Sequence, residues 1–249
     1  MHKNKEWLET EFIGNGRSAD DIAKECGVTN VTIRFWARKF GLKRRRYGSK
    51  SLDDRYFEKI DTEQKAYWLG FIAADGSVQN KPGKRLLSIC LSEKDVEHLL
   101  MFRTHIKSDH SIYHAHRITS FGPCRSAQLD LSSAKMVSDL SKCGIVPRKS
   151  LILSPPQIRK SLVRHWIRGY FDGDGSVSAN GSFCIVGTDA VVKFIRSNLP
   201  VNLCLRKVGK CTRIDSVRKS SFPKLYNHLY KGSSIHLGRK HEIFRKLGE

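Results

Sequence analysis

The sequence predicts an α+β protein in which two similar half-domains, each of element order αββαββα, follow a small all-helical domain. Three observations predict this fold. The segment YWLGFIAADGSV at residues 67–78 returns as WIRGYFDGDGSV at residues 166–177, which indicates an internal duplication. The strands that follow each copy come as hairpins, whereas a nucleotide-binding α/β fold would place helical crossovers between them. Residues 1–46 instead carry the periodicity of short amphipathic helices.

The composition is strongly basic. Lys and Arg number 45 against 24 Asp and Glu, so the 249-residue chain has a formal net charge of +21. Basic residues exceed acidic ones both before and after residue 50, so we expect a polyanion to contact both parts. Excess charge that serves only solubility is the alternative.

The cysteines and the apolar segments bear on the compartment. The seven cysteines form no Cys-x-x-Cys pair, which disfavours a disulfide framework or a zinc ribbon and fits a reducing compartment. The sequence shows no apolar signal region and no run of membrane-spanning length. We therefore expect a soluble protein with no membrane partner, located in the cytoplasm or nucleoid, an organelle or a phage-infected host, and not secreted.

The first domain is expected at residues 1–46. Ser18 followed by Asp21 is typical of a helix start, Gly27 ends that helix, and Thr29 starts the next one. The stretch SADDIAKECGVTNVTIRFWARKFGL resembles a helix-turn-helix of recombinases and repressors, with residues 29–40 as the recognition helix. An ordinary helical hairpin is the alternative. The candidate DNA contacts on this helix are Asn30, Thr32, Arg34 and Arg38.

A basic segment joins this module to the rest. The run KRRRYGSKS occupies residues 43–51, and we place a linker at residues 47–55. Arg44, Arg45 and Arg46 are candidates for phosphate contacts, with a nuclear-localisation signal as the alternative reading.

Each copy of the repeat is expected to be a helix with a strip of small residues. Gly70 stands four positions before Ala74, and Gly169 stands four before Gly173. Because positions i and i+4 share a helix face, the two backbones can pack very closely along these strips. Parallel packing would bring the two C-terminal ends together.

The converging ends carry Asp75 and Asp174. A carboxylate at a helix C-terminus opposes the helix dipole, and two facing carboxylates repel each other unless cations lie between them. The sequence therefore predicts a metal site where the two helices end.

The remaining segments supply the hairpins and covering helices of the two half-domains, placed at residues 56–150 and 151–249. Asn180-Gly181 is a strong hairpin signal, and Lys81-Pro82-Gly83 has the same position in the first half. The other predicted elements are helices at 93–106 and 189–199 and strand pairs at 111–118 with 126–131 and 203–208 with 211–218.

The segments WLGFIAADG and IRGYFDGDG resemble the two signatures of single-chain LAGLIDADG homing endonucleases, and the resemblance covers about residues 56–249. Ala73 replaces the first acid of the consensus, while Asp172 keeps it in the second copy. The resemblance implies two saddle-shaped antiparallel sheets over double-stranded DNA, a monomer, and catalysis by the second acid of each motif. It further implies hydrolysis of both strands across the minor groove, with 3′ overhangs at a long asymmetric site.

The predicted reaction is metal-assisted, since the sequence has no Ser-His-Asp or Cys-His signal and no phosphate-binding glycine loop. Asp75 and Asp174, with the backbone carbonyls of Ala74 and Gly173, are expected to hold Mg²⁺, for which hard oxygen ligands are suited. Mn²⁺ or Ca²⁺ can substitute in binding.

An Arg-Lys pair recurs near the end of each half, in IVPRKS at residues 145–150 and IHLGRKHE at 235–242. The resemblance implies a lysine near the metal, so we expect Lys149 and Lys240 to polarise water or stabilise the attacked phosphate. Phosphate contact without a catalytic role is the alternative. The other candidate DNA contacts are Gln128, Arg148, Arg206, Lys207, Arg213, Arg218 and Arg239.

His114 and His116 could share a strand face, but no third ligand stands at a spacing typical of zinc sites, so no zinc is expected.

A group I intron maturase, with intron RNA as partner, and a non-cleaving DNA-binding regulator are the alternatives to the endonuclease. An intein is not expected, because the chain shows neither a Cys or Ser start nor a His-Asn finish.

Overall fold

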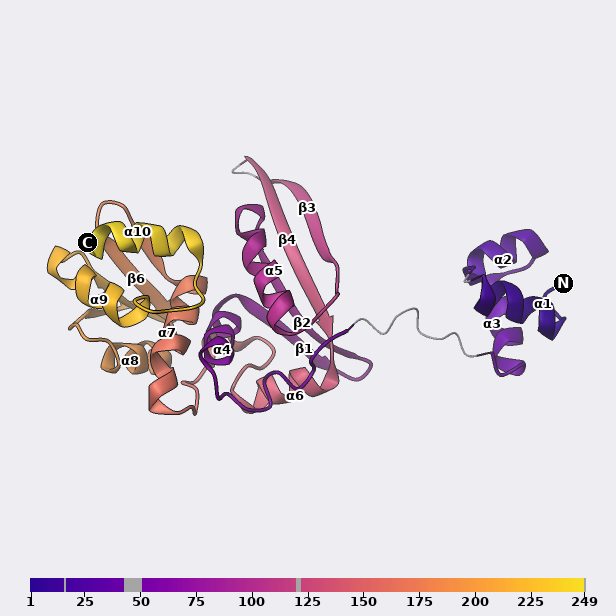
Figure 1. Ribbon diagram of the computed structural model, residues 1–249, viewed down its shortest axis with the longest axis horizontal. Coiled ribbons are helices and arrows are strands. Elements are labelled where there is room, and N and C mark those ends of the chain that lie inside the picture. Colours follow the sequence, from indigo (N-terminus) through magenta and orange to yellow (C-terminus); the bar gives the residue numbers. More distant parts are fainter. Residues whose placement is uncertain (16, 43–50, 120–121, 249) are drawn as a thin grey trace. The chain divides into compact units, whose positions relative to one another are not determined.

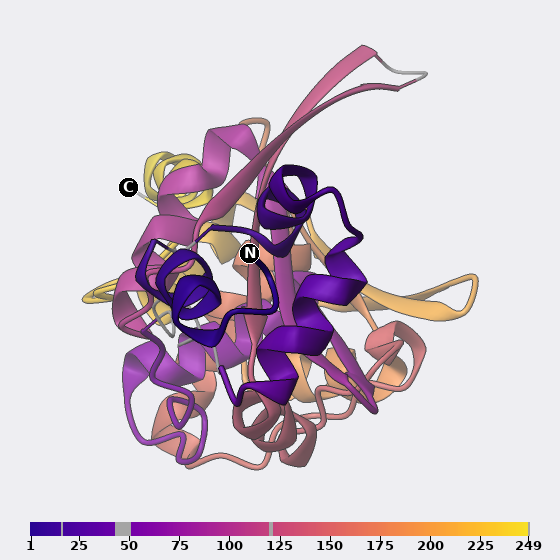
Figure 2. The same ribbon diagram turned by 90° about the vertical axis from the view of Figure 1, so that its right-hand side faces the viewer.

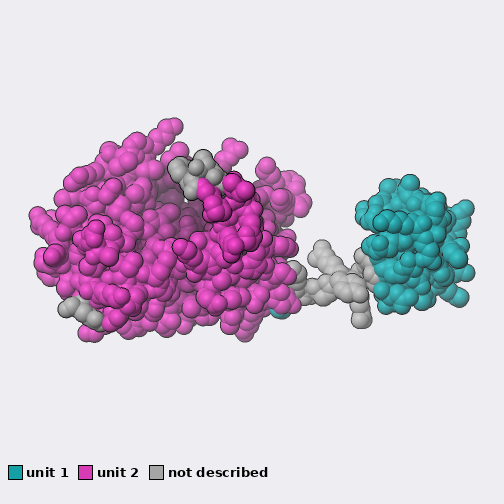
Figure 3. Space-filling view, turned by 90° about the horizontal axis from the view of Figure 1, so that it is seen from above, with its two compact units in different colours: residues 1–51 teal, residues 52–249 magenta. Residues whose placement is uncertain are grey.

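The computed structural model describes residues 1–15, 17–42, 51–119 and 122–248. The chain forms two compact units, Met1–Ser51 and Leu52–Glu249, which Figure 3 shows in different colours. The boundaries expected between the helical module, the linker and the half-domains stay predictions. No helix in the described ranges is long and apolar enough to cross a membrane.

The first unit is helical. Ser18 caps a helix by accepting the backbone N–H of Asp21 at 3.0 Å, and Gly27 ends that helix with a left-handed φ of 63°. Ile22 and Ile33, from successive helices, are fully buried in a small core. The elements are α1 (Lys5–Glu9), the π-helical turn η1 (Thr10–Gly14), α2 (Ala19–Cys26) and α3 (Asn30–Lys39) (Figure 1).

The second unit contains the predicted duplication, and its fold class is confirmed as mixed helices and antiparallel sheets. The first half runs in the order αββαββα, with a 3₁₀ turn before its second helix. Its elements are α4 (Glu63–Asp75), β1 (Gly76–Lys81), β2 (Lys84–Ser92), η2 (Glu93–Asp95), α5 (Val96–His105), β3 (Ile112–Thr119), β4 (Gly122–Ser132) and α6 (Ala134–Lys142).

The second half repeats this order and adds a helix, α10, that the sequence analysis did not anticipate. The first half ends with the 3₁₀ turn η3 (Lys149–Leu151). The elements of the second half are α7 (Lys160–Asp174), β5 (Ser176–Ser178), β6 (Ser182–Gly187), α8 (Asp189–Ser197), β7 (Cys204–Val208), β8 (Cys211–Ser216), η4 (Lys219–Ser221), α9 (Phe222–Leu229) and α10 (Gly238–Gly248).

Each half builds one four-stranded antiparallel sheet, in the order β1-β2-β4-β3 and β5-β6-β8-β7. Strand β4 begins at Gly122, four residues earlier than expected, so the hairpin that it forms with β3 is long (Figure 2). Gly122 has φ 108°, a conformation that glycine adopts without steric cost.

One face of each sheet is covered by helices and the other is polar. In the first sheet Leu87 and Ile89 of β2 are fully buried, whereas Ser88 between them faces the opposite way. In the second sheet Phe183 and Ile185 of β6 are buried in the same manner. The buried faces join α4 and α7 in one apolar core.

Candidate active site

Helices α4 and α7 pack with their backbones in contact. A Cβ atom added to Gly70 would lie 2.0 Å from the carbonyl oxygen of Trp166, and one added to Gly169 would lie 1.9 Å from that of Tyr67. Further along, a Cβ on Gly173 would lie 2.4 Å from the Cβ of Ala74. The structure therefore brings together the four residues of the predicted helix interface. At Gly70 and Gly169 the backbone of the facing helix leaves no room for a side chain.

This contact places both acids in one place. Asp75 and Asp174 are the last residues of α4 and α7, and the added Cβ of Gly173 would lie 3.5 Å from the carboxyl carbon of Asp75. Gly76 and Gly175 follow, and the chain turns back so tightly that a Cβ on either would lie within 3.0 Å of the preceding helical turn. These glycines let the chain leave each helix directly into a strand.

The two acids resist ionisation. Burial between the helix ends, together with the neighbouring carboxylate of Asp174, raises the pKa of Asp75 to about 6. Burial also raises the pKa of Asp174, although the ammonium groups of Lys149 and Lys240 act in the opposite direction. Positive charge supplied at this point would therefore stabilise the ionised pair.

Each helix end also receives a buried lysine. Lys149 donates from Nζ to the carbonyl oxygens of Ala74 at 3.0 Å and Gly76 at 2.6 Å. Lys240 donates to four carbonyls at the end of α7, which belong to Phe171, Asp172, Gly173 and Gly175. Ammonium groups at helix C-termini complement the negative end of the dipole.

Burial alters the acidity of these lysines. It lowers the pKa of Lys149 and lowers that of Lys240 to about 8, while the nearby aspartates oppose the change. The carboxylates of Asp75 and Asp174 are close enough to both ammonium groups to favour their charged forms. One lysine comes from each half of the unit. The structure thus brings together all four residues predicted to be catalytic.

The donor set fits a hard divalent cation. Within the described ranges no cluster of three or more His, Cys, Asp or Glu side chains could hold a metal alone. Mg²⁺ typically takes one or two carboxylates and completes its shell with water and substrate phosphates. Asp75 and Asp174 provide such a pair, and a cavity of about 260 Å³ adjoins Asp174, Lys149 and Ala74. The carbonyls of Ala74 and Gly173 already accept from the lysines, and each has a second lone pair.

Two ion pairs that the sequence did not indicate, each with one buried partner, join the halves beside the site. Arg168 of α7 is fully buried and donates to Glu63 of α4 at 2.7 Å and to two backbone carbonyls. Arg239, whose predicted DNA contact stays a prediction, is exposed and donates from Nε to both carboxylate oxygens of Asp95 at 2.9 and 3.1 Å. The partners are more than 100 residues apart in each case, so no local pattern could reveal them.

The candidate contacts of α3 divide into two groups. Arg34 and Arg38 are exposed, and neither forms an ion pair with another described residue. Asn30 donates to the carboxylate of Asp20 at 2.5 Å, and the hydroxyl of Thr32 lies 3.1 Å from that of Thr29, so these two serve the start of the helix. The predicted residues Arg44, Arg45 and Arg46 lie outside the described residues.

The polar face of the first sheet is organised around Asp130. The hydroxyl of Ser88 donates to this carboxylate at 2.5 Å, and the amide of Gln128 donates to it at 2.9 Å. Tyr113 of β3 pairs with Gln128 of β4 on this polar face. The next residue of β3, His114, pairs with the buried Ala127 of β4. His114 therefore belongs to the other face.

The two histidines of β3 do not form a metal site. The Nδ1 atom of His114 lies 2.8 Å from a carboxylate oxygen of Glu93, and His116 is exposed on the same side of the strand. In the described part of the chain no third ligand joins them.

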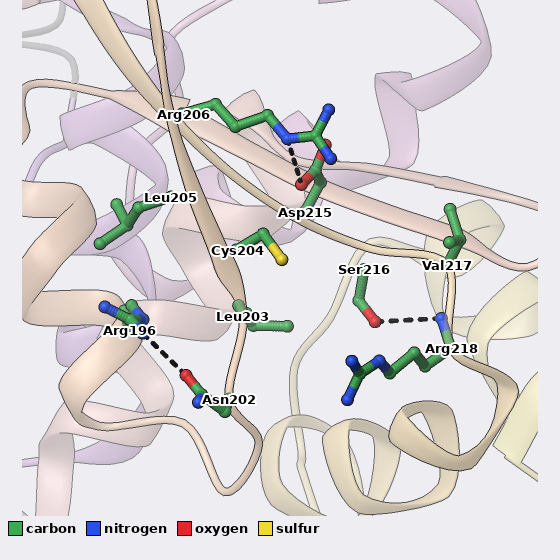
Figure 4. Close-up of a pocket in the computed structure, with 10 residues that line it drawn as sticks. All are labelled: Arg196, Asn202, Leu203, Cys204, Leu205, Arg206, Asp215, Ser216, Val217 and Arg218. Carbon is green, nitrogen blue, oxygen red and sulfur yellow. Dashed lines mark hydrogen bonds and ion pairs between the residues drawn. The ribbon is translucent and has the colours of Figure 1, made fainter.

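The polar face of the second sheet is cationic. Asp215 lies 3.2 Å from Nε of Arg213 and 3.8 Å from Nε of Arg206, and all the arginines here remain exposed. A cavity of about 310 Å³ opens beside Asp215, lined by Arg206 and Arg218 among others (Figure 4). Lys207 pairs with Asp189 at 3.2 Å. Arg148 is exposed beside the active site, with a left-handed φ of 59°.

No model of a known protein family matches the chain, and no curated protein matches its sequence. Its fold is similar to that of solved structures. The homing endonuclease I-WcaI bound to its DNA recognition sequence matches with a TM-score of 0.51 at 13% identity, over 75% of this chain and 90% of that chain. The I-SmaMI LAGLIDADG homing endonuclease bound to cleaved DNA matches with a TM-score of 0.50 at 14% identity, over 73% and 87%. The second unit thus has the fold of LAGLIDADG homing endonucleases.

Proposed function

We propose that this protein is a site-specific endonuclease that binds double-stranded DNA and hydrolyses one phosphodiester bond in each strand with Mg²⁺. The observation that carries the proposal is the convergence of Asp75 and Asp174 at the ends of two helices in backbone contact. Two acids in that position oppose both helix dipoles and each other. A cation bound between them relieves both costs, so the arrangement is suited to a metal site.

The chemistry follows from this donor set. The carboxylates of Asp75 and Asp174, with the carbonyls of Ala74 and Gly173, would hold Mg²⁺, and Mn²⁺ or Ca²⁺ would replace it in binding. When bound, Mg²⁺ lowers the pKa of an attacking water and stabilises the leaving 3′ oxygen. Lys149 and Lys240 hold their ammonium groups at the same helix ends, where they stabilise negative charge on the attacked phosphate.

DNA is the polyanion that this arrangement fits. The chain carries a formal net charge of +21, and within the described residues of the second unit no helix covers the polar face of either sheet. Gln128 suits adenine and the exposed Arg206 and Arg213 suit guanine, because their side chains match the donor and acceptor patterns of those bases. Since the two sheets present different side chains, the target is an asymmetric site that one monomer binds. Cleavage of the two strands leaves 3′ overhangs.

The helical unit adds a second DNA contact. Arg34 and Arg38 lie exposed on α3, the helix proposed to enter the major groove in a helix-turn-helix manner. This contact lengthens the site without taking part in the chemistry.

Cleavage of a randomised duplex library tests the proposal and identifies the target at once. The protein is incubated with the library in Mg²⁺ or in EDTA, and newly formed ends are sequenced. We expect one family of sequences with staggered 3′ ends in Mg²⁺, and no such ends in EDTA or with Asp75→Asn. Selection of a bound sequence with no cut ends in Mg²⁺ or Mn²⁺ would contradict the proposal and indicate a non-cleaving regulator.

A further inference from the structure

The two halves differ in the residue two positions before the active-site acid. The first half has Ala73 there, and the second has Asp172, whose side chain is almost completely buried at 1% exposure. Burying a carboxylate costs several kcal/mol unless hydrogen bonds compensate it. Asp172 points away from the two converging acids into the protein interior, where its carboxylate must find hydrogen-bond donors.

Three donors converge on the Asp172 carboxylate. The hydroxyl of Tyr230 donates to Oδ1 at 2.5 Å, and that of Tyr67 donates to Oδ2 at 2.7 Å. The third donor is the backbone N–H of Leu237, 2.8 Å from Oδ2. Tyr67 comes from α4 of the first half, so this acid also contacts the other half of the protein.

The Leu237 contact fixes the start of α10. Leu237 precedes that helix, and its carbonyl accepts the backbone N–H groups of Lys240 at 3.1 Å and His241 at 3.0 Å. Lys240 lies in the first turn, and its ammonium group returns to the carbonyls at the end of α7. A side chain of α7 thus holds the backbone of α10, while a side chain of α10 holds the backbone of α7.

Among the described residues of the first half there is no such reciprocal contact, because Ala73 offers no side-chain acceptor. Lys149 lies in the short 3₁₀ turn η3, and Arg148 before it adopts the left-handed conformation. Its ammonium group has two carbonyl partners, against four for Lys240. Both ammonium groups thus bind the carbonyls at a helix C-terminus, but Lys149 is carried by a 3₁₀ turn and Lys240 by a helix that Asp172 holds in place.

We propose that Asp172 is a positioning residue for Lys240, so that the centre served by Lys240 depends on a buried contact that the Lys149 centre does not have. This inference rests on the proposed endonuclease function. It implies that loss of Asp172 slows the cutting of one DNA strand and largely spares the other.

Strand-resolved cleavage tests the proposal. Asp172→Asn keeps the shape of the side chain but replaces one acceptor oxygen by an NH₂ donor and removes the charge, so the three donors can no longer all be satisfied. With the target labelled on either strand and enzyme saturating, we expect one strand to be cut at least about tenfold more slowly and the other to change by less than about threefold. Nicked circles should then accumulate from supercoiled plasmid. The double variant Asp172→Asn/Lys240→Ala should be no slower than Lys240→Ala alone, because the two residues act as one unit.

Asp139→Asn is the matched control. Asp139 is a second buried aspartate, at 2% exposure, but its partners are Lys135 and Lys142 on α6, away from the site. We expect it to lower the melting temperature without strand bias. Equal slowing of both strands by Asp172→Asn, or the same bias in Asp139→Asn, would overturn the proposal.

A measurement on the unaltered protein covers the case in which Asp172→Asn does not fold or the protein cuts no DNA. The backbone amide of Leu237 precedes its helix and would exchange quickly with solvent deuterium if unbonded. Because Asp172 accepts this amide in a buried place, we expect it to exchange about as slowly as amides inside α7. Fast exchange would refute the contact on which the proposal depends, whatever the protein cleaves.

Discussion

The substitution Gly169→Ala tests the backbone contact that creates the site. Its added methyl would lie 1.9 Å from the carbonyl oxygen of Tyr67, whereas real Cβ contacts essentially never fall below 3.0 Å. The atom in the way is backbone, which cannot rotate aside. Helices α4 and α7 would therefore have to separate by about 1 Å at this point.

Two effects follow from that separation. Overpacking of this kind typically costs about 1–3 kcal/mol of unfolding free energy. For a unit of this size each kcal/mol corresponds to a change of about 2–4 °C in melting temperature, so we expect a fall of about 2–12 °C. A shift of about 1 Å between reacting groups can lower a rate by about a hundredfold, so Asp75 and Asp174 should act poorly even in protein that remains folded.

The assay measures melting by circular dichroism and single-turnover cleavage at saturating enzyme. Gly238→Ala is the matched control, because an added Cβ there meets no atom within 4 Å and the residue is also helical. It should melt at the same temperature or slightly higher. If Gly169→Ala melts within a degree of the parent and cuts at the parent rate, the close backbone packing does not create the site.

Four further results are expected. Arg168→Met should lower the unfolding free energy in urea by about 3–5 kcal/mol, because it leaves the carbonyls of Ile235 and Leu229 without their buried donor and Glu63 without its ion pair. Lys149→Ala and Lys240→Ala should each lower the single-turnover rate about tenfold at unchanged salt dependence of binding, whereas loss of a simple phosphate contact would reduce the salt slope by about one. In the metal-free protein the raised pKa of Asp75, about 6, means that the folded state holds its proton more tightly than the unfolded state. Its stabilising contribution should thus be complete below about pH 4, decline as the pH rises to about 6, and be absent from an Asp75→Asn titration. Removal of residues 1–46 should weaken binding and shorten the protected DNA without moving the cut.

The parts of the site that could be predicted are those encoded by short-range pattern. The duplicated small residues and terminal acids fix which helix faces meet, because i and i+4 positions share a face whatever the rest of the chain does. Asn180-Gly181 likewise predicts its hairpin, since Gly181 supplies the positive φ, 79°, that the turn requires.

The parts that could not be predicted depend on distant partners. The Arg-Lys repeat predicted a similar place for Lys149 and Lys240, but not that the first would lie in a 3₁₀ turn and the second in α10. Both lysines donate to carbonyl oxygens at a helix C-terminus, and this contact depends on how the elements pack in three dimensions. Arg239 is exposed, and its predicted DNA contact stays a prediction. Its ion pair with Asp95 could not be predicted, because that partner is 144 residues away.

Two candidate contacts in the first turn of α3, whose DNA contact stays a prediction, have partners that the sequence did not indicate. Asn30 and Thr32 were assigned to DNA as polar residues on an exposed helix. Polar side chains at a helix start compete for the unpaired groups there, and these two hydrogen-bond to Asp20 and Thr29. Arg34 and Arg38, further along, remain available.

The central claim is that Asp75 and Asp174 act together at the meeting point of the two helices. It is tested most directly by single-turnover cleavage of the selected target with Asp75→Asn and Asp174→Asn, alongside the affinity of each variant for the same DNA in Ca²⁺. We predict that both variants bind within about threefold of the parent and that neither produces double-strand breaks in Mg²⁺. Cleavage of both strands at the parent rate by either variant would contradict the claim.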